Sequence, residues 1–123
     1  MPSIDRPLGG AALRFRLGDA HRQDHIDADL LARSGRTART LVKEGPLRVT
    51  LVALGSGGAL ATHRTDGPIT LHVLSGEVSC RAGTDEWGLV SGDLLSLGAG
   101  VEHAVESASG GVFLLTVATD PHP

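Results

Sequence analysis

Short β-prone segments follow one another along most of the chain, and within them apolar positions alternate with polar ones. Each segment is four to eight residues long and is bounded by turns rich in glycine, proline, serine or aspartate. The segments cover residues 38–43, 47–54, 59–63, 69–74, 77–82, 87–90, 93–97, 102–107 and 112–118. Turns at intervals of about 8–12 residues, with no amphipathic helix between them, are typical of a β-sandwich or barrel and not of βαβ units. The pattern therefore predicts an all-β domain.

The stretch before these segments has no sustained hydrophobic period. Residues 1–36 mix prolines and glycines with charges, which predicts an N-terminal arm that is extended or forms a short helix. An aspartate near one end and an arginine near the other favour a short helix over residues 27–33. Residues 12–17 alternate apolar and basic side chains, so they could add a strand to a sheet edge or to a neighbouring subunit. We therefore place an arm at residues 1–36 and a barrel domain at residues 37–120.

The composition indicates how such a domain is filled. A chain of 123 residues is most simply one domain that can bury a real core. Hydrophobic residues make up 41% of the chain, yet Phe15, Trp87 and Phe113 are its only aromatic residues. The core must therefore consist mainly of leucine, valine, isoleucine and alanine. Seventeen glycines are many for this length, and they fall in the turns that an all-β chain needs.

Charge and cysteine usage exclude several classes of protein. A net charge of −3 leaves no basic stripe that could neutralise a run of phosphates, so we expect no nucleic-acid partner. No apolar run approaches the ~20 residues of a membrane helix, so we expect no membrane partner. Cys80 is the single cysteine, which excludes an internal disulfide framework and favours a cytoplasmic location. We interpret Cys80 as a small packed side chain and not as a nucleophile.

Two histidines carry the candidate chemistry, because each lies inside a glycine-punctuated β segment. His63 is in HRTDGPITLHVLSG, residues 63–76, and His103 is in GDLLSLGAGVEHAVES, residues 92–107. The first stretch resembles the first motif of the cupin superfamily, in which a glycine precedes HxH, a glutamate and a closing glycine. The second stretch resembles the second cupin motif, with Gly92, then Gly98-Ala99-Gly100 in place of PxG, then His103. The resemblance covers about residues 37–118.

The resemblance implies a cupin-type double-stranded β-helix, a jelly-roll barrel preceded by an N-terminal arm. In a typical cupin, two histidines and a glutamate of the first motif and the histidine of the second hold Fe, Mn, Ni, Cu or Zn. This chain matches that ligand set at His63 and His103 only. Thr65 stands where the second histidine would be, and Ile69 stands in place of the glutamate. The resemblance thus implies half of the usual metal site.

His72 is a third candidate ligand, and its place depends on the turn before it. If Asp66-Gly67 forms a two-residue hairpin, His63 pairs with Thr70, and His72 lies diagonally from His63 on the same face. A three-residue loop shifts the register by one and sends His72 to the opposite face. The residues leave both alternatives open.

These observations predict a small cupin that binds a small molecule in its barrel pocket. His63, His103 and His72 are the candidate metal ligands, and Thr65, Ile69 and Trp87 are the candidate pocket walls. The pocket either holds one divalent transition metal weakly or is free of metal. The alternative function is a metal-dependent enzyme of the dioxygenase or isomerase type, for which no catalytic residue can be assigned. The resemblance also implies a homodimer.

Overall fold

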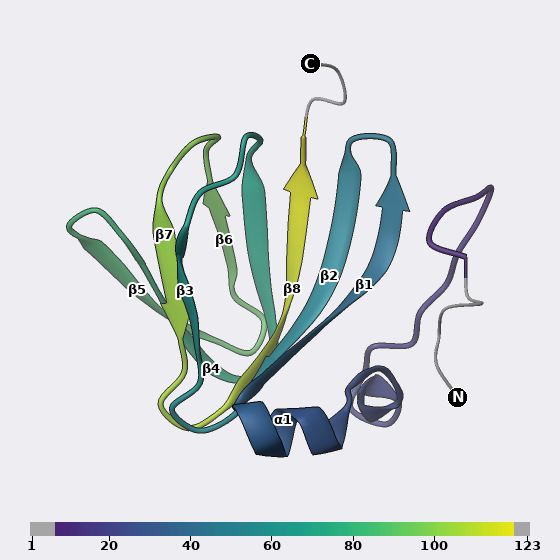
Figure 1. Cartoon of the computed structure of the whole chain (residues 1–123), viewed down its shortest axis with the longest axis horizontal. Coiled ribbons are helices and arrows are strands. Elements are labelled where there is room, and N and C mark those ends of the chain that lie inside the picture. The colour runs from purple at the N-terminus through teal and green to yellow at the C-terminus, as the bar shows by residue number, and fades with distance from the viewer. Residues whose placement is uncertain (1–6, 120–123) are drawn as a thin grey trace.

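The computed structural model describes residues 7–119, and most of them belong to antiparallel β-strands that curl into an open barrel (Figure 1). A short 3₁₀ helix, η2 (Arg22–His25), and a short α-helix, α1 (Ala28–Ser34), precede the strands. The strands are β1 (Arg36–Glu44), β2 (Leu47–Leu54), β3 (Ala59–His63), β4 (Ile69–Ala82), β5 (Asp85–Val90), β6 (Leu94–Leu97), β7 (His103–Glu106) and β8 (Gly111–Ala118). The all-β prediction is confirmed. The outer parts of the predicted arm and barrel, residues 1–6 and 120, lie outside the described residues.

Strand β4 joins the two halves of the barrel. The strand order is β1-β2-β8-β4-β7-β3, and β5 and β6 also pair with β4. The first part of β4 pairs with β6 and β8, and its second part pairs with β5 and β7. The pairing with β8 is irregular between Val73 and Ser75, where the strand passes from one sheet to the other. The two segments predicted at 69–74 and 77–82 are therefore one strand with a bulge.

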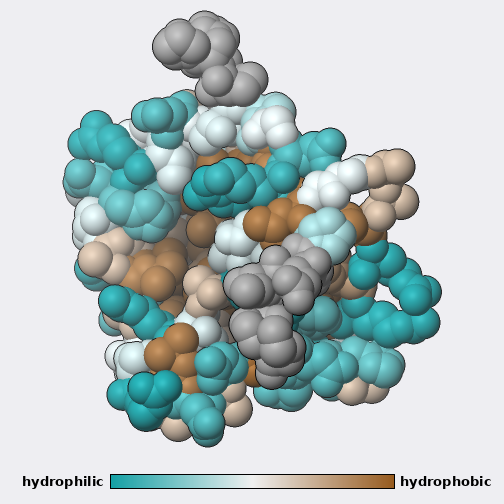
Figure 2. Space-filling view, turned by 45° about the vertical axis from the view of Figure 1, so that its right-hand side comes forward, coloured by the Kyte–Doolittle hydropathy of each residue, from teal (hydrophilic) through white to brown (hydrophobic). Residues whose placement is uncertain are grey.

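The core lies on the concave side of this curled sheet. In β4 the buried positions alternate as Ile69, Leu71 and Val73, and after the bulge they continue at Val78 and Cys80. Leucine, valine and isoleucine dominate the core, as the composition predicts; its other members include Val52, Leu54, Leu97, Val105, Phe113 and Val117. Figure 2 shows polar residues over much of one face, with hydrophobic residues visible in patches between them.

The arm is tied to the first strand. The predicted helix is confirmed as α1, and the carboxylate of Asp27 caps its N-terminus by accepting a hydrogen bond from the Leu30 N–H at 3.0 Å. Residues 12–17 form no strand, so the predicted added strand is wrong within this chain. The arm instead contacts β1 through hydrogen bonds. The Lys43 N–H donates to the Leu8 carbonyl, the Gly10 N–H donates to the Glu44 carboxylate, and the Arg39 guanidinium donates to the Asp24 carbonyl. Within residues 7–119, no helix has the length and apolar character needed to span a membrane.

Glu77 holds the loop between β7 and β8. Its carboxylate accepts hydrogen bonds from the backbone N–H groups of Ala108 and Ser109 at 2.8 and 3.0 Å. The Ser109 N–H does most to lower the pKa of Glu77 below its ordinary value of 4.5. Desolvation opposes this shift in pKa, while the Ser107 hydroxyl and the Ala108 N–H add to it. The charged carboxylate is thus part of the folded loop.

We expect Glu77→Gln to reduce the pH dependence of stability. Because the folded-state pKa is lowered, the carboxylate stabilises the fold fully above pH 4.5, and this stabilisation is lost as the pH falls through the lower folded-state pKa. Denaturant unfolding at several pH values should show the wild-type advantage over Glu77→Gln shrinking below about pH 4.5. Glu106→Gln, a change at an exposed position of β7, is the control. An advantage over Glu77→Gln that stays constant down to pH 3 would contradict the assignment.

Candidate functional site

His63 and His103 lie directly opposite each other on neighbouring strands. β3 and β7 pair with Leu60 opposite Val105 and His63 opposite His103. Three residue steps on β3 therefore match two steps on β7, and this bulge lets His63 face the same side as His103. That side is the inner one, because Val105 belongs to the core and His103 is buried. The ring centroids are 4.3 Å apart, with an angle of 62° between the ring planes.

Both imidazoles are held in the same way. Nδ1 of His63 lies 3.0 Å from the Ala61 carbonyl oxygen, and Nδ1 of His103 lies 3.0 Å from the Val101 carbonyl oxygen. A carbonyl only accepts, so each Nδ1 carries the proton, and Nε2 of a neutral ring is an acceptor. The Nε2 atoms form no hydrogen bond to another residue of the described chain. His103 is 2% exposed and His63 is exposed, so the pair extends from the core to the surface.

The loops at this end of the barrel are also connected. The Gly100 N–H donates to the Thr65 carbonyl at 2.8 Å, and the Thr65 hydroxyl donates to the Gly67 carbonyl at 2.7 Å. Nη2 of Arg64 lies 3.1 Å from a carboxylate oxygen of Glu102, but both side chains are more than half exposed, so this pair adds little stability. A cavity of about 260 Å³ lies here, lined by Arg48, Arg64, Thr65, Asp66, Val117 and Thr119.

Both alternatives for the turn before His72 assumed a hairpin between the segments of His63 and His72, and the structure shows no such hairpin. β3 pairs with β7 and not with β4, so Asp66-Gly67 lies in a connection between strands that are not neighbours. Strand β4 places Leu71 and Val73 in the core, and His72 between them faces the outer side. The cross-strand partners of His72 are Leu94 and Leu114. The structure therefore does not bring His72 to the histidine pair.

The other predicted pocket residues have different surroundings. Thr65 lines the cavity described above. Ile69 is 2% exposed and is a member of the hydrophobic core. Trp87 is partly buried, packs against the core and lies opposite Cys80 in the pairing of β4 with β5. Burial raises the pKa of the Cys80 thiol, which suits a packed side chain.

The side chains present do not fit the metal site that the resemblance implies. A typical site needs three or four nitrogen or oxygen donors around one ion. Two imidazoles meet in this barrel, while Thr65 and Ile69 occupy the positions of the other ligands and His72 faces away. In the part of the chain that the structure describes, no three histidine, cysteine, aspartate or glutamate side chains gather closely enough to hold an ion.

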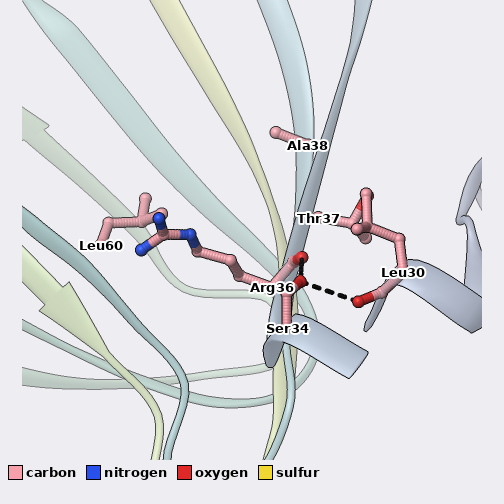
Figure 3. Close-up of a pocket in the computed structure, with 6 residues that line it drawn as sticks. All are labelled: Leu30, Ser34, Arg36, Thr37, Ala38 and Leu60. Atoms are coloured by element: carbon pink, nitrogen blue, oxygen red, sulfur yellow. Dashed lines mark hydrogen bonds between the residues drawn. The ribbon is translucent and has the colours of Figure 1, made fainter. Parts of the chain in front are cut away.

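A second cavity lies near the start of β3, and it was not predicted from the sequence. This cavity has a volume of about 300 Å³ and is lined by Leu30, Ser34, Arg36, Thr37, Ala38 and Leu60 (Figure 3). Arg36 and Ala38 lie opposite the core residues Leu54 and Val52 of β2, which places both on the inner face of β1. Arg36 was assigned to the arm, although it is the first residue of β1. Only the register of β1 with β2 reveals that it faces inward.

Comparison with known proteins identifies the fold. No protein-family model and no curated protein matches the sequence. A cupin superfamily protein of Desulfitobacterium hafniense has a TM-score of 0.67 at 19% identity, over 69% of this chain and 78% of that chain. A Klebsiella pneumoniae protein with a double-stranded β-helix domain has a TM-score of 0.69 at 18% identity, over 80% and 86% of the two chains.

An additional similar structure is KdgF from a Halomonas species, with a TM-score of 0.63 at 13% identity over 72% of this chain and 81% of that chain. At these identities the likeness concerns the fold and does not extend to ligands or reactions. The strand order agrees with it, because one long strand joins two sheets that curl around a common core. The chain therefore has the cupin fold, an all-β double-stranded β-helix.

Proposed function

We propose that this protein binds a small organic molecule at the end of the barrel where His63 and His103 pair. The observation that carries the proposal is the hydrogen bonding of the two imidazole rings, which is the same in both. Each Nδ1 is held by a backbone carbonyl, while each Nε2 has no hydrogen-bond partner among the described residues. Two fixed acceptors beside an apolar core favour a ligand that presents hydroxyl or N–H donors and has an apolar part.

The histidines serve as hydrogen-bonding groups in this proposal, and not as half of a resident metal centre. Fixed rings lose little side-chain freedom when a ligand binds, which favours affinity. The burial of His103 places one acceptor where water competes poorly, so its hydrogen bond to a ligand is stronger than one in open solvent. His63 is exposed and leaves the pair accessible from outside.

A screen of small polyols, hydroxy acids and amides by ligand-observed NMR tests the proposal. We expect at least one class to bind, and His63→Ala to weaken its binding about two- to ten-fold, the effect of losing one hydrogen bond. His72→Ala is the matched control, because it removes the same side chain from the outer face. The proposed site would be refuted if His63→Ala and His72→Ala lowered the affinity equally, or if neither variant changed it.

Elemental analysis of protein purified without a His-tag tests the absence of a resident metal. Two imidazoles without a third protein donor should lose added Zn²⁺ or Ni²⁺ on dialysis. A stoichiometric metal that survives dialysis and disappears in His63→Ala would contradict the proposal and favour the metal-dependent enzyme.

A further inference from the structure

An exposed arginine, with no counter-charge among the described residues, borders the cavity between α1, β1 and β3. The Arg36 side chain extends from β1 toward Leu60 of β3, as Figure 3 shows, and its Nη1 donates to the Ala59 carbonyl at 3.2 Å. Among the described residues, Arg36 forms no ion pair. A guanidinium has five N–H donors, so most of the hydrogen-bonding capacity of Arg36 stays free at the open rim of this cavity.

The rest of the cavity lining is mostly apolar. Leu30, Ala38 and Leu60 supply hydrocarbon surface from three separate elements. The Ser34 hydroxyl lies 2.7 Å from the carbonyls of both Leu30 and Arg36, so it is already occupied. α1 has no buried residue, and Leu30, which lines the cavity, is 36% exposed. The helix thus presents apolar surface that no described residue covers.

A free guanidinium beside apolar walls favours a ligand that has both an anionic group and a hydrocarbon body. The planar guanidinium binds a carboxylate through two parallel hydrogen bonds. The apolar walls would contact a hydrocarbon body, and about 300 Å³ is at the lower end of the range for small-molecule sites. A phosphate dianion suits this cavity less, since one arginine supplies one positive charge and the other walls are apolar.

We propose that this cavity is a second binding site, which takes a small monocarboxylic acid with an apolar body. The carboxylate pairs with Arg36, and the body lies against Leu30, Ala38 and Leu60. The site is separate from the histidine pair, because Leu60 lies near the start of β3 and His63 is its last residue. The inference therefore does not depend on the function proposed above.

Phenylacetate is a suitable probe, and 2-phenylethanol is its neutral counterpart. Titration of ¹⁵N-labelled protein with phenylacetate should shift the backbone amide signals of α1, of the start of β1 and of Leu60. We expect 2-phenylethanol to bind about two- to five-fold more weakly, because it lacks the charge that pairs with the exposed guanidinium. Shifts centred on His63 and His103 instead would overturn this inference while leaving the proposed function standing.

Three variants separate the role of the charge from that of the cavity. Arg36→Gln should weaken phenylacetate binding about two- to five-fold and leave 2-phenylethanol binding little changed. Arg33→Gln removes a charge from the last turn of α1 outside the cavity, and it should leave both affinities unchanged. Ala38→Leu adds a side chain to the cavity and should weaken both probes, which keeps the test decisive if Arg36→Gln proves unstable. Equal phenylacetate binding by wild type and Ala38→Leu, or no binding to wild type, would overturn the inference.

Discussion

Gly76→Ala should destabilise the fold by about 2–5 kcal/mol, the sum of two costs. Gly76 has a φ of +72°, and an L-residue in this left-handed conformation costs about 1–2 kcal/mol. An added Cβ would also collide with the Gly110 carbonyl oxygen and come within 2.8 Å of the Gly111 Cα. Both contacts are backbone atoms at and just before the start of β8, which cannot rotate away, and overpacking of this kind costs about 1–3 kcal/mol more.

Gly83→Ala is the control that isolates the collision. Gly83 has a φ of +62°, close to that of Gly76, but no heavy atom lies within 4 Å of its added Cβ. We expect Gly83→Ala to show the conformational cost alone, about 1–2 kcal/mol. Urea unfolding of the two variants beside the wild type measures the difference. Equal losses of unfolding free energy would show that the close approach of β4 and β8 does not matter.

This glycine also shows why the fold could be predicted from the sequence. The sequence marks Gly76 as the closing glycine of the first motif, and the structure gives the physical reason, since β4 bends from one sheet to the other beside it. Most strand positions follow from local alternation and turn residues; the segments predicted at 47–54 and 59–63 have the observed bounds of β2 and β3. The resemblance then supplied the arrangement of the strands, which the structural comparisons support.

The candidate site was harder to predict, because it depends on pairings between distant segments. A local interpretation of Asp66-Gly67 led to a hairpin, whereas β3 pairs with β7, about forty residues later in the chain. His72 faces outward because its neighbours Leu71 and Val73 are buried, an alternation that is present in the sequence but that both hairpin alternatives left aside. Arg36 faces inward through its pairing with Leu54. The homodimer, the divalent metal and the cytoplasmic location stay predictions.

Phe113→Ala should be the most destabilising of the simple core truncations, at about 3–5 kcal/mol. Phe113 is 0% exposed and is the largest fully buried side chain among the described residues. It lies on β8 between Val52 of β2 and Val73 of β4, so it fills the centre of the inner face. With few other aromatic residues in the chain, the surrounding aliphatic side chains cannot refill a cavity of that size without moving the strands.

Leu94→Ala is the matched control, because Leu94 is a large apolar residue that is 64% exposed on the outer face. We expect it to change the unfolding free energy by less than about 0.5 kcal/mol, as surface substitutions do. Urea unfolding of both variants measures the contrast, and the amide spectrum of Phe113→Ala shows whether the strands keep their arrangement. If Phe113→Ala cost no more than Leu94→Ala, the inner face of β8 could not be the centre of the core. Stability would then have to come from the outer face, where His72 and Leu94 lie.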